Sequence, residues 1–248
     1  MKALILVAGY ATRLYPLTLN KPKALLPIAK KPILNYIVDE IETIPSVNEI
    51  ILVSNNKFYK NFLEWQQENS FSVPVTVLND YTTDETNKLG AIGDIQYVID
   101  KLNINEDLLV MAGDNIFTFS LIDFYNAYAE KNSDTILVKN INSIADLRRM
   151  ANVEVDEDGF VVGMIEKPQN PKTNLAAFAS YIYKKDTLPL IKEFLQSGEN
   201  PDAPGFFPSW LFNKKSVYAY RFVGECYDIG TPESYEKVNR IFEQRSRD

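Results

Sequence analysis

The sequence predicts a single α/β domain built on a doubly wound, largely parallel but mixed sheet. Two observations support this fold class. Through the first half of the chain, short apolar runs typical of buried strands alternate with segments of helical spacing, and repeated alternation of this kind favours a parallel sheet. The 248 residues are 46% hydrophobic and 24% charged, which is ordinary for a globular protein with a sizeable core.

The first half contains the alternating elements. Residues 2–8 form an apolar run that predicts a buried first strand. Pro32 then precedes the best-defined helix, 33–44, in which isoleucine recurs at helical spacing. The remaining elements follow the same alternation, with strands at 49–53, 73–78, 107–112 and 135–139 and helices at 59–68, 91–102 and 121–131.

The second half is richer in strands. Two runs, 152–155 and 160–165, flank an Asp-Gly turn and predict a hairpin. Further strands are expected at 177–183 and 217–222, and helices at 186–196, with Asp186 as the N-cap, and at 232–245. The aromatic segment 205–212 is expected to pack in the core, with a subunit contact as the alternative. No repeat or linker interrupts the chain, so 1–248 reads as one domain in which both halves share a sheet.

Composition excludes several classes of function. The net charge of −7 gives no basic field for nucleic acid or an anionic membrane, and no apolar run approaches the roughly 18–20 residues that cross a bilayer. The single cysteine, Cys226, permits no internal disulfide and fits a cytoplasmic location. Because the chain has no histidine, its chemistry must use carboxylates, cations, hydroxyls and backbone.

The loop after the first strand is the most informative segment. The small residues Ala8, Gly9 and Ala11 would let backbone N–H groups approach a phosphate chain, and Arg13 and Lys23 would neutralise its charge. This pattern predicts a site for a nucleoside triphosphate. A plain tight connection between two elements is the alternative.

Two aspartates could bind a metal ion. Asp114 ends a buried strand, where the ligand crevice of an open α/β sheet lies, and Asp228 precedes a Gly-Thr-Pro turn. Magnesium is usually held by one or two carboxylates together with phosphate oxygens and water. A turn role for Asp114 and a local capping role for Asp228 are the alternatives.

Taken together, these strings resemble the sugar-phosphate nucleotidyltransferases. The segments that carry the resemblance occur in the family's order over nearly the whole chain: 6–18, 21–25, 113–117, 166–168 and 228–235. The string 113–117 is especially similar to that of glucose-1-phosphate thymidylyltransferases. The resemblance implies a short form without a C-terminal β-helix. It also implies a Rossmann-like nucleotide-binding half over about 1–140 and a sugar-phosphate-binding half over about 141–248.

The resemblance also implies roles for individual residues. Catalysis is expected from Arg13, Lys23 and Lys167, and Mg²⁺ is expected on Asp114 and Asp228. Nucleotide contacts are expected from Ala8, Gly9, Tyr10, Ala11, Thr12, Arg13, Lys23, Glu85, Gly90 and Asp114. Sugar-phosphate contacts are expected from Asn115, Glu166, Lys167, Asn174 and Ser180.

The chain departs from the family pattern at four positions. Ala11 replaces a glycine, which is tolerable if its φ is negative. Glu85 stands where a base-reading glutamine is common, and an ionised glutamate only accepts hydrogen bonds, so the identity of the base stays open. Ala151 replaces a sugar-contacting glycine, and Cys226 stands where tryptophan is frequent.

The expected activity is coupling of an NTP, with dTTP or UTP favoured, to a sugar-1-phosphate, giving an NDP-sugar and pyrophosphate. One alternative is a CTP-dependent cytidylyltransferase acting on choline phosphate or an alditol phosphate. The other is a non-catalytic paralogue that binds nucleotide sugars and regulates a partner. The expected partners are these small molecules, with the chain acting as a monomer or a small homo-oligomer.

Overall fold

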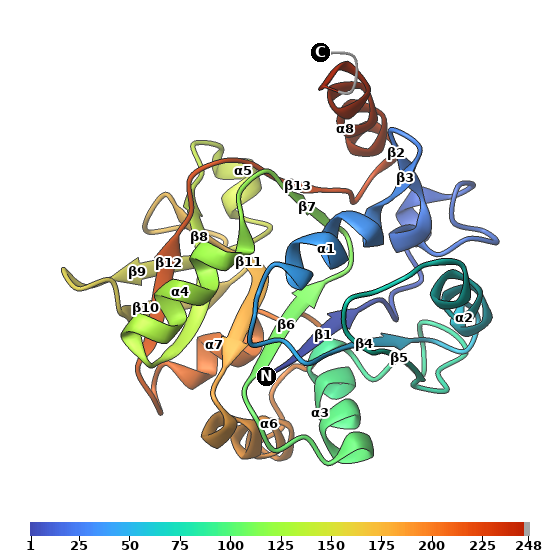
Figure 1. Ribbon diagram of the computed structural model, residues 1–248. Coiled ribbons are helices and arrows are strands. Elements are labelled where there is room, and N and C mark those ends of the chain that lie inside the picture. Colours follow the sequence, from blue (N-terminus) through green and yellow to red (C-terminus); the bar gives the residue numbers. More distant parts are fainter. Residues whose placement is uncertain (246–248) are drawn as a thin grey trace. The chain divides into compact units, whose positions relative to one another are not determined.

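The computed structural model describes residues 1–245 and has the α/β fold with a mixed sheet that the sequence predicts. It comprises two compact units (Figure 1). Unit 1 contains residues 1–2, 89–111 and 122–223, and unit 2 contains 3–88, 112–121 and, within the described chain, 224–245. The division into halves at about residue 140 stays a prediction.

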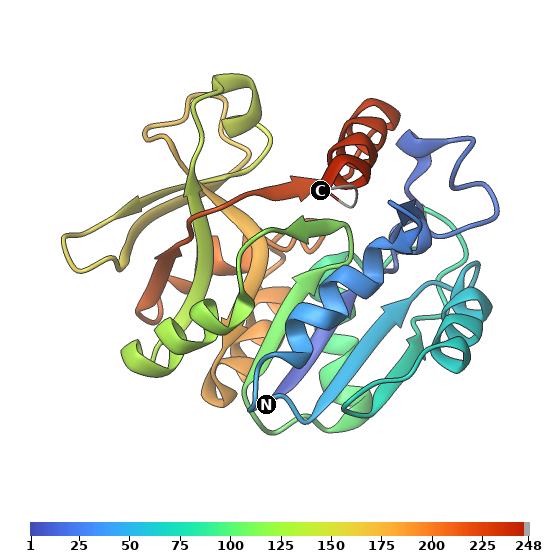
Figure 2. The same cartoon turned by 45° about the horizontal axis from the view of Figure 1, so that its top comes forward.

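Unit 2 is built on the strands β1 (Lys2–Leu6), β4 (Glu49–Ser54) and β5 (Val75–Asn79), which neighbour one another in that order. β4 and β5 are parallel, as expected for a βαβ alternation. Helix α1 (Ile33–Glu42) lies over one face of these strands, and α2 (Tyr59–Glu68) lies beside β5 (Figure 2). The isoleucines that predicted α1 are fully buried, so helical spacing and burial agree.

Short elements complete unit 2. They are the 3₁₀ turns η1 (Thr12–Leu14) and η2 (Lys23–Leu25), the hairpin β2 (Pro27–Ile28) and β3 (Lys31–Pro32), the two-stranded ribbon β7 (Asn115–Phe117) and β13 (Cys226–Asp228), and helix α8 (Pro232–Arg245). α8 is the predicted closing helix. The ribbon and the hairpin were not predicted, because strands of two or three residues carry no periodicity that a sequence pattern can detect.

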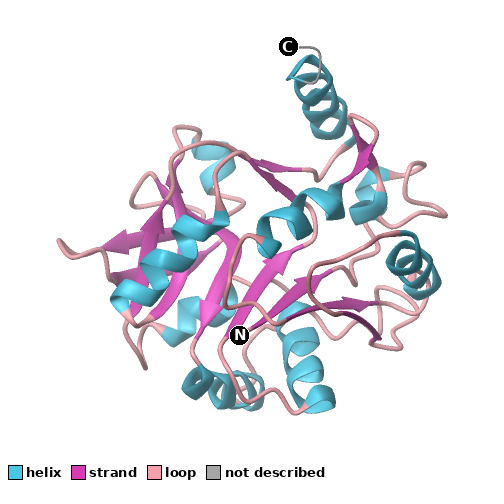
Figure 3. Ribbon diagram, in the orientation of Figure 1, coloured by secondary structure: helices cyan, strands magenta, loops and turns pink. Residues whose placement is uncertain are grey.

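Unit 1 is the strand-rich part that the second half of the sequence predicts. β11 (Leu175–Tyr183) pairs antiparallel with β6 (Leu108–Ala112), β8 (Asp134–Asn140) and β9 (Ala151–Val155), and β9 forms the predicted hairpin with β10 (Val161–Glu166). β12 (Val217–Arg221) adds to β8 in parallel. The helices are α3 (Ala91–Leu102), α4 (Leu121–Lys131), α5 (Ile144–Leu147), α6 (Leu188–Gln196) and α7 (Phe206–Leu211), with the 3₁₀ turn η3 (Lys185–Thr187) before α6 (Figure 3).

The aromatic segment that sequence analysis singled out forms α7 and packs in the core of unit 1. Phe207 is fully buried, and its ring lies 5.2 Å from that of Tyr183 on β11 and 5.7 Å from that of Phe194 on α6. Trp210 stacks on Phe207 at 6.1 Å. Core packing is therefore the role the structure shows for these rings.

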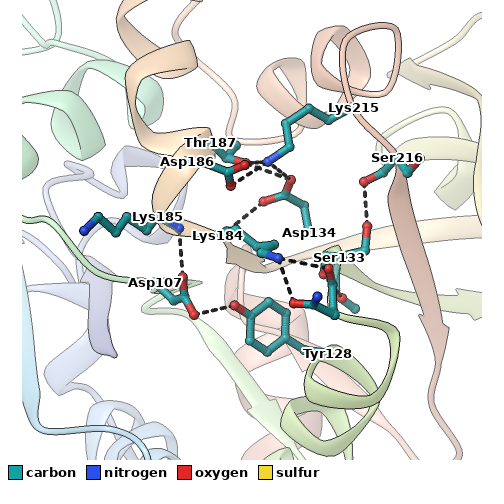
Figure 4. Close-up of polar contacts among 12 residues, drawn as sticks. Asp107, Tyr128, Ser133, Asp134, Lys184, Lys185, Asp186, Thr187, Lys215 and Ser216 are labelled. Carbon is teal, nitrogen blue, oxygen red and sulfur yellow. Dashed lines mark hydrogen bonds and ion pairs between the residues drawn. The ribbon is translucent and has the colours of Figure 1, made fainter.

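A buried carboxylate fixes the start of β8 in unit 1 (Figure 4). Asp134 is 1% exposed and accepts hydrogen bonds from the Lys184 backbone N–H at 2.7 Å and the Thr187 hydroxyl at 2.8 Å. The Lys215 ammonium lies 3.3 Å away and is its counter-charge. Burial raises the pKa of Asp134, and these three partners lower it.

The expected N-cap role of Asp186 is wrong. Its carboxylate pairs with Lys215 at 2.8 Å, which lowers its pKa, and helix α6 begins two residues later, at Leu188. The Lys215 ammonium binds this carboxylate more strongly than free backbone N–H groups would, because the ammonium carries a full charge.

A second carboxylate joins the same region of unit 1. Asp107 accepts from the Tyr128 hydroxyl at 2.6 Å and from the Lys185 backbone N–H at 2.8 Å (Figure 4). Burial and then this bond to Asp107 raise the pKa of Tyr128 well above its ordinary value.

Over residues 1–245, no helix combines the length and apolar character needed to cross a bilayer.

Candidate nucleotide and metal site

The first loop, residues 8–14, follows β1 and is held at its start by Asn55. The Val7 N–H donates to the Val53 carbonyl at 3.0 Å, which keeps the chain beside β4 as it leaves the strand. The Asn55 side chain, fully buried at the end of β4, donates to the Ala8 carbonyl at 2.7 Å and accepts from the Phe58 N–H at 3.0 Å. Gly9 is exposed, and a methyl group added to it would meet nothing within 4 Å.

Ala11 adopts a left-handed conformation, with φ 50° and ψ 41°, so the condition of a negative φ, under which its methyl group would be tolerated, is not met. The position therefore has the backbone that favours glycine in the family. Two hydrogen bonds to the Ala11 carbonyl hold this conformation, one from the Thr18 hydroxyl at 2.8 Å and one from the Leu14 N–H at 3.0 Å. The turn η1 that follows buries Leu14 and leaves Thr12 and Arg13 exposed.

Gly113 brings the first aspartate beside the first strand. Its N–H donates to the Leu6 carbonyl at 3.0 Å, and a methyl group in place of its hydrogen would lie 2.4 Å from Val7 Cγ1. Only glycine fits this close approach of two backbones. Asp114, the next residue, accepts from the Lys23 ammonium at 2.5 Å.

The β7–β13 ribbon brings the second aspartate to the first. Asp228 is the register partner of Asn115, and the Ile229 N–H donates to the Asp114 carbonyl at 3.1 Å. A methyl group on Gly230 would lie 3.3 Å from Asp228 Oδ2 and 3.9 Å from Arg13 Nη2. The two carboxylates and both predicted cations of unit 2 therefore converge on one place.

The electrostatics of this place fit a divalent cation. Desolvation by the surrounding chain and then the charge of Asp114 raise the pKa of Asp228, although part of the residue stays exposed; Lys23 and Arg13 oppose the shift. The two carboxylates thus repel each other even with both cations present, and a metal ion would relieve that repulsion. Among the described residues, no group of three or more Asp, Glu or Cys side chains could hold a metal. The roles of Asp114 and Asp228 as the pair of carboxylates that would hold Mg²⁺ stay predictions.

The other predicted residues of unit 2 include one in the β7–β13 ribbon and one in a loop after β5. Asn115 is buried on β7. Glu85 lies in the second loop, residues 80–88, where its carboxylate is half exposed and 3.4 Å from the Lys88 ammonium. Its charge contributes to the raised pKa of Tyr10, after the larger effects of burial and of Asp80 and Asp84, so the second loop lies near the first.

Unit 1 contains the remaining predicted residues. Glu166 has a side chain 8% exposed, and burial raises its pKa while Lys167, 3.7 Å away, lowers it. A methyl group on Gly205 would lie 2.0 Å from Glu166 Oε2 and 3.4 Å from Ala151 Cβ, so these three positions are adjacent. Lys167 has a left-handed backbone, with φ 50°, and a side chain that is half exposed.

The other three predicted positions of unit 1, Gly90, Asn174 and Ser180, differ in how closely the rest of the chain packs around them. Gly90 has φ 79°, and a methyl group there would lie 2.6 Å from the Pro201 carbonyl oxygen, so the start of α3 requires glycine. Asn174 is exposed at the start of β11. Ser180 is fully buried on β11, and its hydroxyl has no hydrogen-bond partner among the described residues. The ligand roles of these residues stay predictions.

The roles of Asn55 and Thr18, whose side chains hold the first loop, were not predicted from the sequence. An asparagine after a buried strand is usually read as a turn residue, and only the structure shows that it bonds to Ala8, 47 positions away. The convergence of Asp114 and Asp228 was expected, but the ribbon that produces it was not.

Comparison with known proteins shows which proteins this chain resembles. A protein of Sulfolobus acidocaldarius assigned as a mannose-1-phosphate guanyltransferase is 29% identical over 96% of this chain and 62% of its own length. The UTP–glucose-1-phosphate uridylyltransferase AglF of Haloferax volcanii is 27% identical over 99% of this chain and 98% of its own length. The chain thus spans about three fifths of the length of the first curated relatives that it matches, and nearly all of AglF.

A solved structure shows the same fold. The structure of a Bacillus anthracis protein assigned as a glucose-1-phosphate thymidylyltransferase superposes with a TM-score of 0.84, at 21% identity, over 98% of this chain and 95% of that one. The sequence profile of the nucleotidyl transferase family matches residues 2–245. The chain therefore belongs to the nucleotidyl transferase family.

Proposed function

We propose that this protein is a sugar-1-phosphate nucleotidyltransferase. An oxygen of the acceptor phosphate attacks the α-phosphorus of an NTP, the bond from that phosphorus to the β-phosphate oxygen breaks, and pyrophosphate leaves. The observation that carries the proposal is the convergence of two cations and two carboxylates beside the first loop of unit 2. Such a site can neutralise a triphosphate and still hold a divalent cation.

The protein's own groups suffice for this reaction without a general base. The acceptor phosphate is largely dianionic at neutral pH, since its second pKa is about 6, so it needs no deprotonation, and the chain has no histidine. Arg13 stabilises the charge that develops on the leaving pyrophosphate, and Lys23 steadies the triphosphate. Lys167 binds the acceptor phosphate. Positioning and electrostatic stabilisation supply most of the acceleration.

Asp114 and Asp228 are the residues that would hold Mg²⁺. When bound, the metal withdraws charge from the α-phosphate and offsets the repulsion between the two anionic substrates. Lys23 contacts one oxygen of Asp114, so this carboxylate would share its charge between the ammonium and a bound metal ion.

For the nucleotide, we propose a pyrimidine NTP, UTP or dTTP. A glutamate at position 85 can accept a hydrogen bond from the N3–H of uracil or thymine. AglF, a relative that the chain matches over nearly its whole length, is named for UTP and glucose 1-phosphate. CTP with choline phosphate or an alditol phosphate is the second candidate, because Glu85 can equally accept from the cytosine amino group.

The test is a matrix of substrates. The protein is incubated with Mg²⁺ and each of UTP, dTTP, CTP, GTP and ATP against several sugar-1-phosphates and choline phosphate, and pyrophosphate release is measured. We expect release with a sugar-1-phosphate and UTP or dTTP, and none from Asp114→Asn. Release only with CTP and choline phosphate would select the second candidate. A purified, folded protein that is inactive with every pair would contradict the proposal and favour a regulatory nucleotide-sugar-binding role.

A further inference from the structure

The side chain of Tyr10, in the first loop, is hydrogen-bonded to the second loop. The ring is buried, 6% exposed, and its hydroxyl donates to the Thr82 hydroxyl at 3.3 Å. The Thr82 hydroxyl in turn donates to both oxygens of the Asp80 carboxylate, at 2.8 and 2.9 Å. Thr82 and Asp80 are buried as well, so this is a chain of hydrogen bonds shielded from water, in which each bond is stronger than at the surface.

Thr82 is fixed at the base of the second loop. Its N–H donates to Asp80 at 2.7 Å, and its carbonyl accepts from the Asn56 N–H at 2.9 Å. Beyond it, the Asn87 side chain accepts from the N–H groups of Thr83 and Asp84, which are bonds within the second loop. Thr82 is thus a fixed point in the loop that contains Glu85.

The residue after Tyr10 shows why the first loop needs this support. Ala11 holds a left-handed backbone that costs an alanine about 1 kcal/mol or more, and such a conformation persists only where neighbouring contacts impose it. Thr18 imposes it from one side, through the Ala11 carbonyl. On the other side, Tyr10 is the adjacent residue whose side chain is buried and hydrogen-bonded.

We propose that Tyr10 is a positioning residue that couples the first loop to the second, so that the phosphate-binding and base-reading segments are held as one preorganised site. The inference rests on the proposed function for the identity of the ligand. Its structural content, the coupling of residues 8–14 to residues 80–88, does not depend on that function. A tyrosine that only filled the core would contribute to stability and leave nucleotide affinity alone.

The test compares variants that delete single hydroxyls. Tyr10→Phe and Thr82→Val should each raise KM for the NTP roughly fivefold, equivalent to about 1 kcal/mol, while kcat changes less than about twofold. The double variant should show little further change beyond Thr82→Val, because Thr82→Val breaks the bond from Tyr10 as well as the bonds to Asp80. Thr82→Ser retains the hydroxyl and, unlike Thr82→Val, should have the wild-type KM for the NTP.

A second readout requires no activity. Amide hydrogen exchange in the nucleotide-free protein should speed up at residues 8–14 and at residues 80–88 when Tyr10 is changed to Phe. Tyr128→Phe is the matched control, because it removes a buried tyrosine hydroxyl that bonds to Asp107 in unit 1. It should lower stability while KM and the exchange of both loops stay as in the wild type.

Unchanged KM and unchanged exchange of the second loop in Tyr10→Phe would overturn the proposal, whatever the change in stability. Should the wild-type protein bind and turn over no NTP, the proposed function fails. The coupling of the two loops then stands or falls on the exchange result alone.

Discussion

At the scale of single residues, Arg13 is an exposed side chain of η1 that contributes charge rather than packing. Its guanidinium reaches the surroundings of Asp228, and it makes no contribution to the core. Arg13→Ala should therefore lower kcat on the order of 10²- to 10³-fold while the free energy of unfolding changes by less than about 0.5 kcal/mol. Arg240→Ala, which removes an exposed arginine paired with Glu236 on α8, is the control and should alter neither. A wild-type rate for Arg13→Ala at saturating substrates would refute the assigned role.

Substitution of Ala11 tests whether the backbone of the first loop is strained. Ala11→Gly removes the strain of the left-handed conformation but makes the unfolded chain more flexible, and these effects are each about 1 kcal/mol and opposite in sign. We expect the free energy of unfolding, measured in urea, to change by less than about 1 kcal/mol. Ala3→Gly, at a fully buried position of β1, has no strain to relieve and should cost about 1 kcal/mol or more. A loss at Ala11 as large as that at Ala3 would contradict the strained assignment.

At the scale of elements, Gly113 and Gly9 differ in whether the fold leaves room for a side chain: a methyl group would collide at Gly113 and would meet open space at Gly9. Gly113→Ala places a methyl group 2.4 Å from Val7 Cγ1 and 3.0 Å from the Leu6 carbonyl, so the turn at residue 113 and the end of β1 must separate, at a cost of about 1 to 3 kcal/mol. Gly9→Ala meets open space and should leave stability within about 0.5 kcal/mol, yet weaken NTP binding, because the phosphates need that space. Thermal unfolding and calorimetric titration with UTP distinguish the two. Equal stability losses would show that the first loop packs differently.

The Asp134–Lys215 pair tests how β8 is fixed in unit 1. Lys215→Met leaves the buried Asp134 without its cation and should cost about 2 to 3 kcal/mol at pH 7, less than a fully buried pair because Lys215 is partly exposed. Lys214→Met, which breaks an exposed pair with Glu193, is the matched control and should cost less than about 1 kcal/mol.

The effect of Lys215→Met should also depend on pH. Because burial raises the pKa of Asp134 above its ordinary 3.8, the folded protein binds a proton that the unfolded chain has already lost. This group's contribution to stability therefore falls as pH rises between the unfolded and folded pKa values. Removing Lys215 raises the folded pKa further, so urea unfolding should show a larger loss at pH 7 than near pH 4. A loss that is independent of pH would mean that Lys215 contributes packing and not charge.

At the scale of the whole molecule, long periodic elements were predictable and short ones were not. The isoleucines of α1, the apolar runs of β1, β4 and β6 and the Asp-Gly turn of the β9–β10 hairpin each predict their element by local pattern. Asp186 misled the prediction of α6, because its preferred partner, Lys215, lies 29 positions along the chain. No pattern within a few residues contains such a contact.

The candidate site was predictable where it rests on motif residues. The convergence of Asp114 and Asp228 near Arg13 was expected from the strings that resemble one family, whereas the ion pair between Lys23 and Asp114 is a finding of the structure. The backbone of Ala11 and the bonds from Asn55, Thr18 and Tyr10 were not predictable, because each depends on contacts between segments that are distant in sequence or on the sign of a dihedral angle.

The central claim is that Asp114 and Asp228 together hold one divalent cation beside a bound nucleoside triphosphate. The most direct measurement is Mn²⁺ binding by electron paramagnetic resonance, in the presence of a non-hydrolysable UTP analogue, for the wild type, Asp114→Asn and Asp228→Asn. The nucleotide alone binds Mn²⁺, so the excess bound per chain is compared with protein-free samples. We predict one additional protein-dependent Mn²⁺ environment in the wild type and its loss in both variants, with folding retained. Retention of that environment, at wild-type affinity, in both folded variants would contradict the account.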